Sequence, residues 1–124
     1  MPQIFTVFQI VIDKDLSDLI NKEGWDAHAK SKAYMQAQLD GDVNLGVQNN
    51  CYTKVAEVVA DDLEHVFEVG NIGPEDRITR LEKMTSISVG DIIADADGVC
   101  SVVNNVGFTP LAPSFHKMVL KEAA

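Results

Sequence analysis

The polar segment from Ser86 to Asp91 contains the residue types that could best do chemistry. It reads Ser-Ile-Ser-Val-Gly-Asp, so two hydroxyls and one carboxylate lie within six residues. Ser and Asp side chains readily hydrogen-bond nearby main-chain groups, and Gly90 tolerates a positive φ. The first interpretation is therefore structural: the segment shapes a turn into the strand that follows it.

The alternative interpretation makes the same segment one wall of a small ligand pocket. Ser86, Ser88 and Asp91 would supply its polar groups, with Asn71 opposite them. A serine nucleophile needs a positioned base, and no histidine stands in a recognisable arrangement with either serine. The Gly-x-Ser-x-Gly motif of α/β-hydrolases is also missing from the sequence. These four residues are therefore candidates for ligand binding, and no catalytic residue is assigned.

The acidic and sulfur-containing residues form no metal-binding pattern. Asp91, Asp95 and Asp97 match part of a calcium loop, but the glutamate at the twelfth position of an EF-hand is missing. Cys51 and Cys100 form no Cys-x-x-Cys motif and have no zinc-like spacing to the histidines. We therefore expect reduced, unligated thiols in a reducing compartment, and neither a metal nor another cofactor.

The formal net charge of the 124-residue chain is −9, and the whole excess of acids lies between Met1 and Asp76. Nucleic acids and anionic membranes attract basic patches. The compact basic cluster in this sequence is limited to Arg77, Arg80 and Lys83. We therefore expect no direct binding to nucleic acid and no binding to a membrane surface.

Acidic side chains also form two rows on segments expected to be helical: Asp61, Asp62, Glu64 and Glu68, and Asp13, Asp15, Asp18 and Glu23. Such rows are usually solvated and keep a small protein soluble. They could instead imitate the phosphates that repeat along a nucleic acid strand. An acidic inhibitor that mimics DNA is therefore kept as an alternative function.

Runs of β-branched and aromatic residues bounded by turn signals predict four strands: Ile4–Ile12, Tyr52–Val59, Ile92–Asp95 and Val99–Asn104. The last two form a C-terminal β-hairpin around Gly98. The first run is largely apolar on both faces, which predicts a strand that is either central and covered on both sides or covered by its own helices. It is also too short to span a bilayer.

Helices are expected between these strands. The first begins at Asp15, the second runs from Ala27 to Leu39 behind a cap at Asp26, and the third begins near Asp61. The third should turn Leu63, Val66 and Phe67 inward, Val43–Asn50 should be a loop, and Ser114–Ala124 should be a closing helix. Residues 1–124 are therefore predicted to form a single α+β domain, with a small mixed or antiparallel sheet of about four strands and helices packed on it.

Two stretches together resemble a family of small bacteriophage and mobile-element proteins, the YodL-like proteins. The first stretch covers residues 52–71, and the second combines Ser86–Ile93 with Asp97-Gly98 and Gly107-Phe108. Met84 and Thr85 stand where the family usually carries an arginine. The resemblance implies a mobile-element setting, in the cytoplasm of a bacterial host cell, and implies no reaction.

The function expected from the sequence is therefore non-enzymatic. We expect an accessory protein that binds another protein and that could form a homo-oligomer. A small-molecule or nucleotide-binding domain, or a weak enzyme with a pocket near Asp91, is the alternative. A deep pocket between the Phe67 helix and the Ile92 hairpin would favour that alternative, whereas an exposed apolar patch would favour a protein partner.

Overall fold

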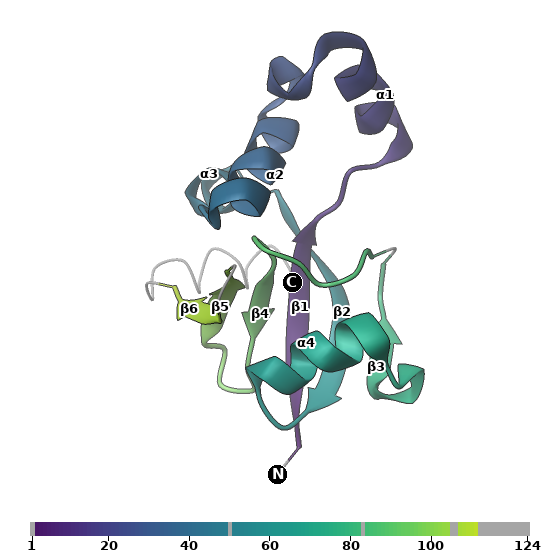
Figure 1. Ribbon diagram of the computed structural model, residues 1–124, viewed down its shortest axis with the longest axis vertical. Helices are drawn as coiled ribbons and strands as arrows, with labels where there is room; N and C mark the ends of the chain where they lie inside the picture. The colour runs from purple at the N-terminus through teal and green to yellow at the C-terminus, as the bar shows by residue number, and fades with distance from the viewer. Residues whose placement is uncertain (1, 50, 83, 105–106, 112–124) are drawn as a thin grey trace.

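The protein is built on one antiparallel sheet. The structure, a computed structural model, describes residues 2–49, 51–82, 84–104 and 107–111. Its strands are β1 (Gln3–Ile10), β2 (Tyr52–Ala60), β3 (Ile78–Arg80), β4 (Ile92–Ala94), β5 (Cys100–Val103) and β6 (Phe108–Pro110). They lie in the order β3-β2-β1-β4-β5-β6, and each neighbouring pair is antiparallel (Figure 1). β1 is therefore a central strand, the first of the two arrangements that its apolar sequence predicts.

The α+β class expected from the sequence is confirmed, but the number of strands is not. The described residues form six strands instead of about four. The two additional strands, β3 and β6, are three residues long and lie at opposite edges of the sheet. Neither has enough residues to show an alternating pattern, and each is fixed by pairing with the strand beside it, β2 or β5.

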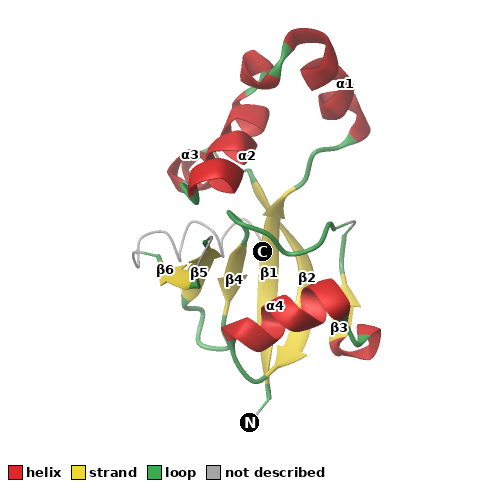
Figure 2. Cartoon of the chain, in the orientation of Figure 1, coloured by secondary structure: helices red, strands yellow, loops and turns green. Residues whose placement is uncertain are grey.

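The segment between β1 and β2 is a helical insert at one end of the sheet (Figure 2). It contains α1 (Lys14–Glu23), a 3₁₀ turn at Trp25–Ala27, α2 (Ala29–Asp40) and α3 (Asn44–Gln48). The prediction of a loop across the α3 segment was therefore wrong. The predicted cap at Asp26 was also wrong, because His28 caps α2 by accepting a hydrogen bond from the Lys30 N–H at 3.0 Å.

α4 (Leu63–Ile72) follows β2 and lies across one face of the sheet (Figure 1). It begins at Asp62, whose carboxylate accepts a hydrogen bond from the His65 N–H at 2.8 Å. Val66 and Val69 are the buried residues of this helix. Phe67 was expected to face inward, but its side chain keeps 38% exposure. One helical step of about 100° separates it from Val66, which places it at the rim of the buried face.

Two apolar clusters cover the two faces of β1. Phe5 and Val7 pack in the cluster beneath α4, whereas Phe8 and Ile10 pack in the cluster that includes residues of α2 and α3. A register shift in the pairing with β2 falls between Val7 and Phe8. Both faces of the buried part of β1 are covered by apolar clusters, which explains why the strand is apolar on both faces. The expected closing helix at Ser114–Ala124 lies outside the described residues.

Candidate functional site

The segment that leads into β4 turns sharply at Gly90, where it packs directly on α2. The Asp91 N–H donates to the Ser88 carbonyl at 3.1 Å, which closes the turn. Gly90 has a φ of +91°, and a Cβ atom added there would lie 2.5 Å from the Ala37 carbonyl carbon and oxygen. Glycine is therefore required twice, by the backbone conformation and by the close approach to the helix.

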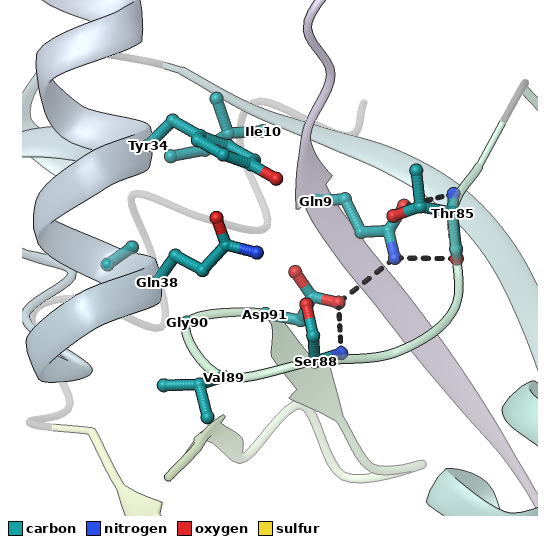
Figure 3. Close-up of a pocket in the computed structure, with 10 residues that line it drawn as sticks. Gln9, Ile10, Tyr34, Gln38, Thr85, Ser88, Val89, Gly90 and Asp91 are labelled. Carbon is teal, nitrogen blue, oxygen red and sulfur yellow. Dashed lines mark hydrogen bonds between the residues drawn. The ribbon is translucent and has the colours of Figure 1, made fainter. Parts of the chain in front are cut away.

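The Asp91 carboxylate organises this segment from the inside. Its Oδ2 atom accepts hydrogen bonds from the Ser88 N–H and from Gln9 Nε2, both at 3.0 Å (Figure 3). Gln9 Nε2 also donates to the Thr85 carbonyl at 3.0 Å, and Gln9 Oε1 accepts from the Thr85 N–H at 3.1 Å. The Gln9 side chain, on the central strand β1, thus forms hydrogen bonds with the N–H and the carbonyl of Thr85 and with one carboxylate oxygen of Asp91.

Burial controls the electrostatics of the site. Asp91 is 9% exposed, and removal of its carboxyl from water raises its pKa from 3.8 to about 7. The hydrogen bonds from Ser88 and Gln9 favour the charged form but offset only part of this effect. Tyr52 donates its hydroxyl to the Gly90 carbonyl at 2.5 Å, and burial raises the pKa of this phenol as well.

A cavity lies between this segment and α2. It has a volume of about 20 Å³ and is lined by Gln9, Ile10, Tyr34, Ala37, Gln38, Thr85, Ser88, Val89, Gly90 and Asp91. A second compartment of about 110 Å³ shares four of these residues and adds Val11, Ile12 and Met84. The arrangement offers hydrogen-bonding groups in a small space next to a larger, more apolar one, and its size limits any ligand to a very small molecule.

The structure divides the four predicted site residues between two hollows. Ser88 and Asp91 line the cavity against α2. Asn71 and Ser86 line a separate polar hollow of about 260 Å³ at the end of α4, together with Arg80. Asn71 donates to the Ile87 carbonyl at 3.1 Å, so it holds the main chain of the same segment from the other side.

Sequence reasoning missed Gln9, Tyr34 and Gln38. Gln9 did carry a signal, because it is a polar residue inside an otherwise apolar strand and is only 3% exposed. A buried amide needs partners for its donors and its acceptor. Tyr34 and Gln38 lie one turn apart on α2, and only the packing of the insert against the sheet brings them to Asp91.

Two large apolar side chains of α4 are exposed, five positions apart and therefore on different sides of the helix. Ile72 is 84% exposed and Phe67 is 38% exposed. Phe67 also lines an open groove of about 210 Å³ with Glu64, Val103, Asn104, Gly107 and Phe108. The region between the Phe67 helix and the hairpin is therefore an open groove with both apolar and polar residues in its walls.

The described residues contain no group of three or more His, Cys, Asp or Glu side chains that could hold a metal ion. Cys51 and Cys100 are present as buried thiols and not as a disulfide. Among the helices that the structure describes, none has the length and apolar character needed to cross a membrane. Comparison of the chain with protein-family models, with curated proteins and with solved structures gives no match.

Proposed function

We propose that this protein is a non-enzymatic accessory protein of a phage or mobile element, and that it binds another protein through the outer surface of α4. The observation that carries this proposal is the exposure of two large apolar side chains on α4: Ile72, at 84%, at its C-terminal end, and Phe67, at 38%, in an open groove. Large apolar side chains at the rim of a groove gain free energy when a partner removes them from water. The mobile-element setting rests on the resemblance of the two sequence stretches.

The negative charge around α4 indicates which surface charge the partner should have. Glu64 and Glu68 are exposed on α4, and Asp61 and Asp62 are exposed just before it. An interface with an apolar centre and an acidic rim is complementary to a partner with an apolar knob and a basic rim. The proposed setting is the bacterial cytoplasm, where Cys51 and Cys100 stay reduced.

A capture experiment from bacterial lysate tests the proposal with matched variants as bait. Ile72→Ser removes the most exposed large apolar side chain among the described residues and Glu68→Lys reverses an exposed charge, and neither change replaces a buried residue. Leu39→Ser, at a position that is 63% exposed on α2, is the control. We expect the wild type and the control to capture the same protein, and the two α4 variants to lose it.

Capture of the same protein by both α4 variants and by the wild type would contradict the proposal. Analytical sedimentation of the purified protein tests the alternative that a second copy of this chain, and not a foreign protein, binds to α4. Self-association that Ile72→Ser abolishes would replace the foreign partner with a homo-oligomer. Loss of the captured protein at raised salt, together with its loss in Glu68→Lys, is expected for a partner with a basic rim.

A further inference from the structure

The cavity against α2 presents an unused carboxylate oxygen. Both hydrogen bonds that the described residues donate to the Asp91 side chain end on Oδ2. The other oxygen points across the cavity toward the Gln38 amide, with the Ser88 hydroxyl beside it and the Tyr34 hydroxyl above (Figure 3). No buried side-chain oxygen or nitrogen of the described residues lacks a hydrogen-bond partner, so this second oxygen is open to solvent and can accept from a donor that enters the cavity.

The size of this compartment limits what can enter it. A volume of about 20 Å³ is enough for a single water molecule or for a group of similar size. A primary ammonium group fits this limit, and its three N–H donors match the carboxylate and the polar side chains around it. Larger cationic groups such as guanidinium would not fit.

The neighbouring compartment suits a short apolar chain. Its volume is about 110 Å³, and Val11, Ile12 and Met84 line it in addition to residues shared with the polar compartment. An apolar cavity of about 150 Å³ holds a benzene molecule, so an alkyl chain of about four or five carbons is the size to expect. Gln38 and Thr85 are exposed, so the mouth lies between α2 and the segment that leads to β4.

The residues that line the two compartments also favour a positively charged ligand over a negatively charged one. Among the described residues that line the two compartments there is no Lys, Arg or His, and Asp91 is the carboxylate. An anion would find no counter-charge among these described residues, whereas a cation would pair with a carboxylate that is largely shielded from water.

We propose that this cavity binds a primary ammonium group on a short alkyl chain, with the ammonium on Asp91 Oδ1 and the chain against Ile12 and Met84. The same chemistry occurs in a free alkylamine and in a lysine side chain. None of the lining residues belongs to α4. The proposal is therefore independent of the protein-binding surface.

The test uses n-pentylamine, with 1-pentanol and pentanoate as neutral and anionic probes of the same length, at about pH 8, where the Asp91 carboxyl is ionised. Two signals report binding: the shift of the melting temperature, and the fluorescence of Trp25, the single tryptophan, which stacks on Tyr34 at 5.7 Å between ring centroids. We expect saturable binding of pentylamine with a dissociation constant of roughly 1 mM. The alcohol and the carboxylate should bind at least about tenfold more weakly.

Three variants locate the site. Asp91→Asn should weaken pentylamine binding by at least about tenfold, and Gln38→Ala, at an exposed position, by about threefold. Asp97→Asn, an exposed acid in the hairpin turn, should leave binding unchanged. Equal binding of amine and alcohol, unchanged binding in Asp91→Asn, or no saturable response to any amine would overturn the proposal.

A second probe distinguishes the two sources of the ammonium group. Nα-acetyl-lysine amide carries the aminobutyl chain of lysine on a peptide-like backbone. If it binds within a few-fold of pentylamine, a lysine side chain of a polypeptide fits the site. If pentylamine binds and the lysine derivative does not, the site takes a free amine. Failure of both probes refutes the assignment of the cavity.

Discussion

Replacement of Asp91 by asparagine should change how the stability of the protein depends on pH. The asparagine side chain keeps an oxygen that can accept from Ser88 N–H and Gln9 Nε2, as Asp91 Oδ2 does. Its amide nitrogen would face the cavity, toward the Gln38 side chain. The substitution therefore removes the titration of the carboxyl while it preserves the hydrogen bonds that hold the turn.

The magnitude follows from the pKa of Asp91, which burial raises from 3.8 to about 7. Because the folded protein binds the proton more tightly than the unfolded chain, this group stabilises the fold most fully below about pH 4. Its contribution then falls as the pH rises to about 7 and is constant above that value. At about 1.4 kcal/mol per pKa unit, the ionised carboxylate costs on the order of 4 kcal/mol at pH 8.

Urea unfolding of the wild type and of Asp91→Asn, at pH values from about 5 to 8 and constant ionic strength, measures this cost. Many other acids titrate in the same range, so the difference between the two proteins is the informative quantity. The variant should already be more stable by somewhat under 2 kcal/mol at about pH 5, and by on the order of 4 kcal/mol at about pH 8. Asp97→Asn serves as the control for removal of an exposed charge. A difference that stays constant within about 0.5 kcal/mol over this range would refute the reasoning.

Four other outcomes follow from the same geometry. Gly90→Ala should destabilise the fold by on the order of 4 kcal/mol in urea unfolding, because it combines a positive φ with a clash against the Ala37 backbone. Gln9→Leu should cost about 3 kcal/mol in the same assay, since it removes two hydrogen bonds to main-chain groups and one to a buried carboxylate. Cys51 and Cys100 should both react with a thiol reagent after denaturation without reductant, and zero reactive thiols would disprove this. Duplex DNA should show no mobility shift with micromolar protein at about 150 mM salt, because a net charge of −9 repels phosphate.

The long elements of this fold could be predicted from the sequence because their patterns extend over many residues. β1 and β2 are eight and nine residues long and rich in apolar residues, and both were predicted within two residues of their ends. The start of α2 was harder to predict, because His28 caps this helix and not Asp26 as expected. The three-residue strands β3 and β6 carry no pattern of their own, since their conformation depends on neighbours far away in the sequence.

The site could be predicted only along the segment that forms its wall. Ser88, Gly90 and Asp91 identified a turn with polar side chains, and the positive φ of Gly90 and the bond from Ser88 N–H to Asp91 agree with that interpretation. The opposite wall could not be predicted, because Tyr34 and Gln38 reach the cavity through the packing of an insert whose helix α2 has weak apolar periodicity. The sequence thus locates the turn, and tertiary packing makes the cavity.

The same turn segment also separates the two surfaces for which we propose functions. On one side Asp91 faces the cavity, and on the other the Asn71 amide of α4 donates to the Ile87 carbonyl at 3.1 Å. α4 also packs tightly there, since a Cβ atom added at Gly70 would overlap the Ile87 side chain. A substitution within residues 86–91 can therefore disturb both surfaces at once. Gln38 and Ile72 lie outside this segment, on α2 and α4, so variants at these two positions separate amine binding from protein binding.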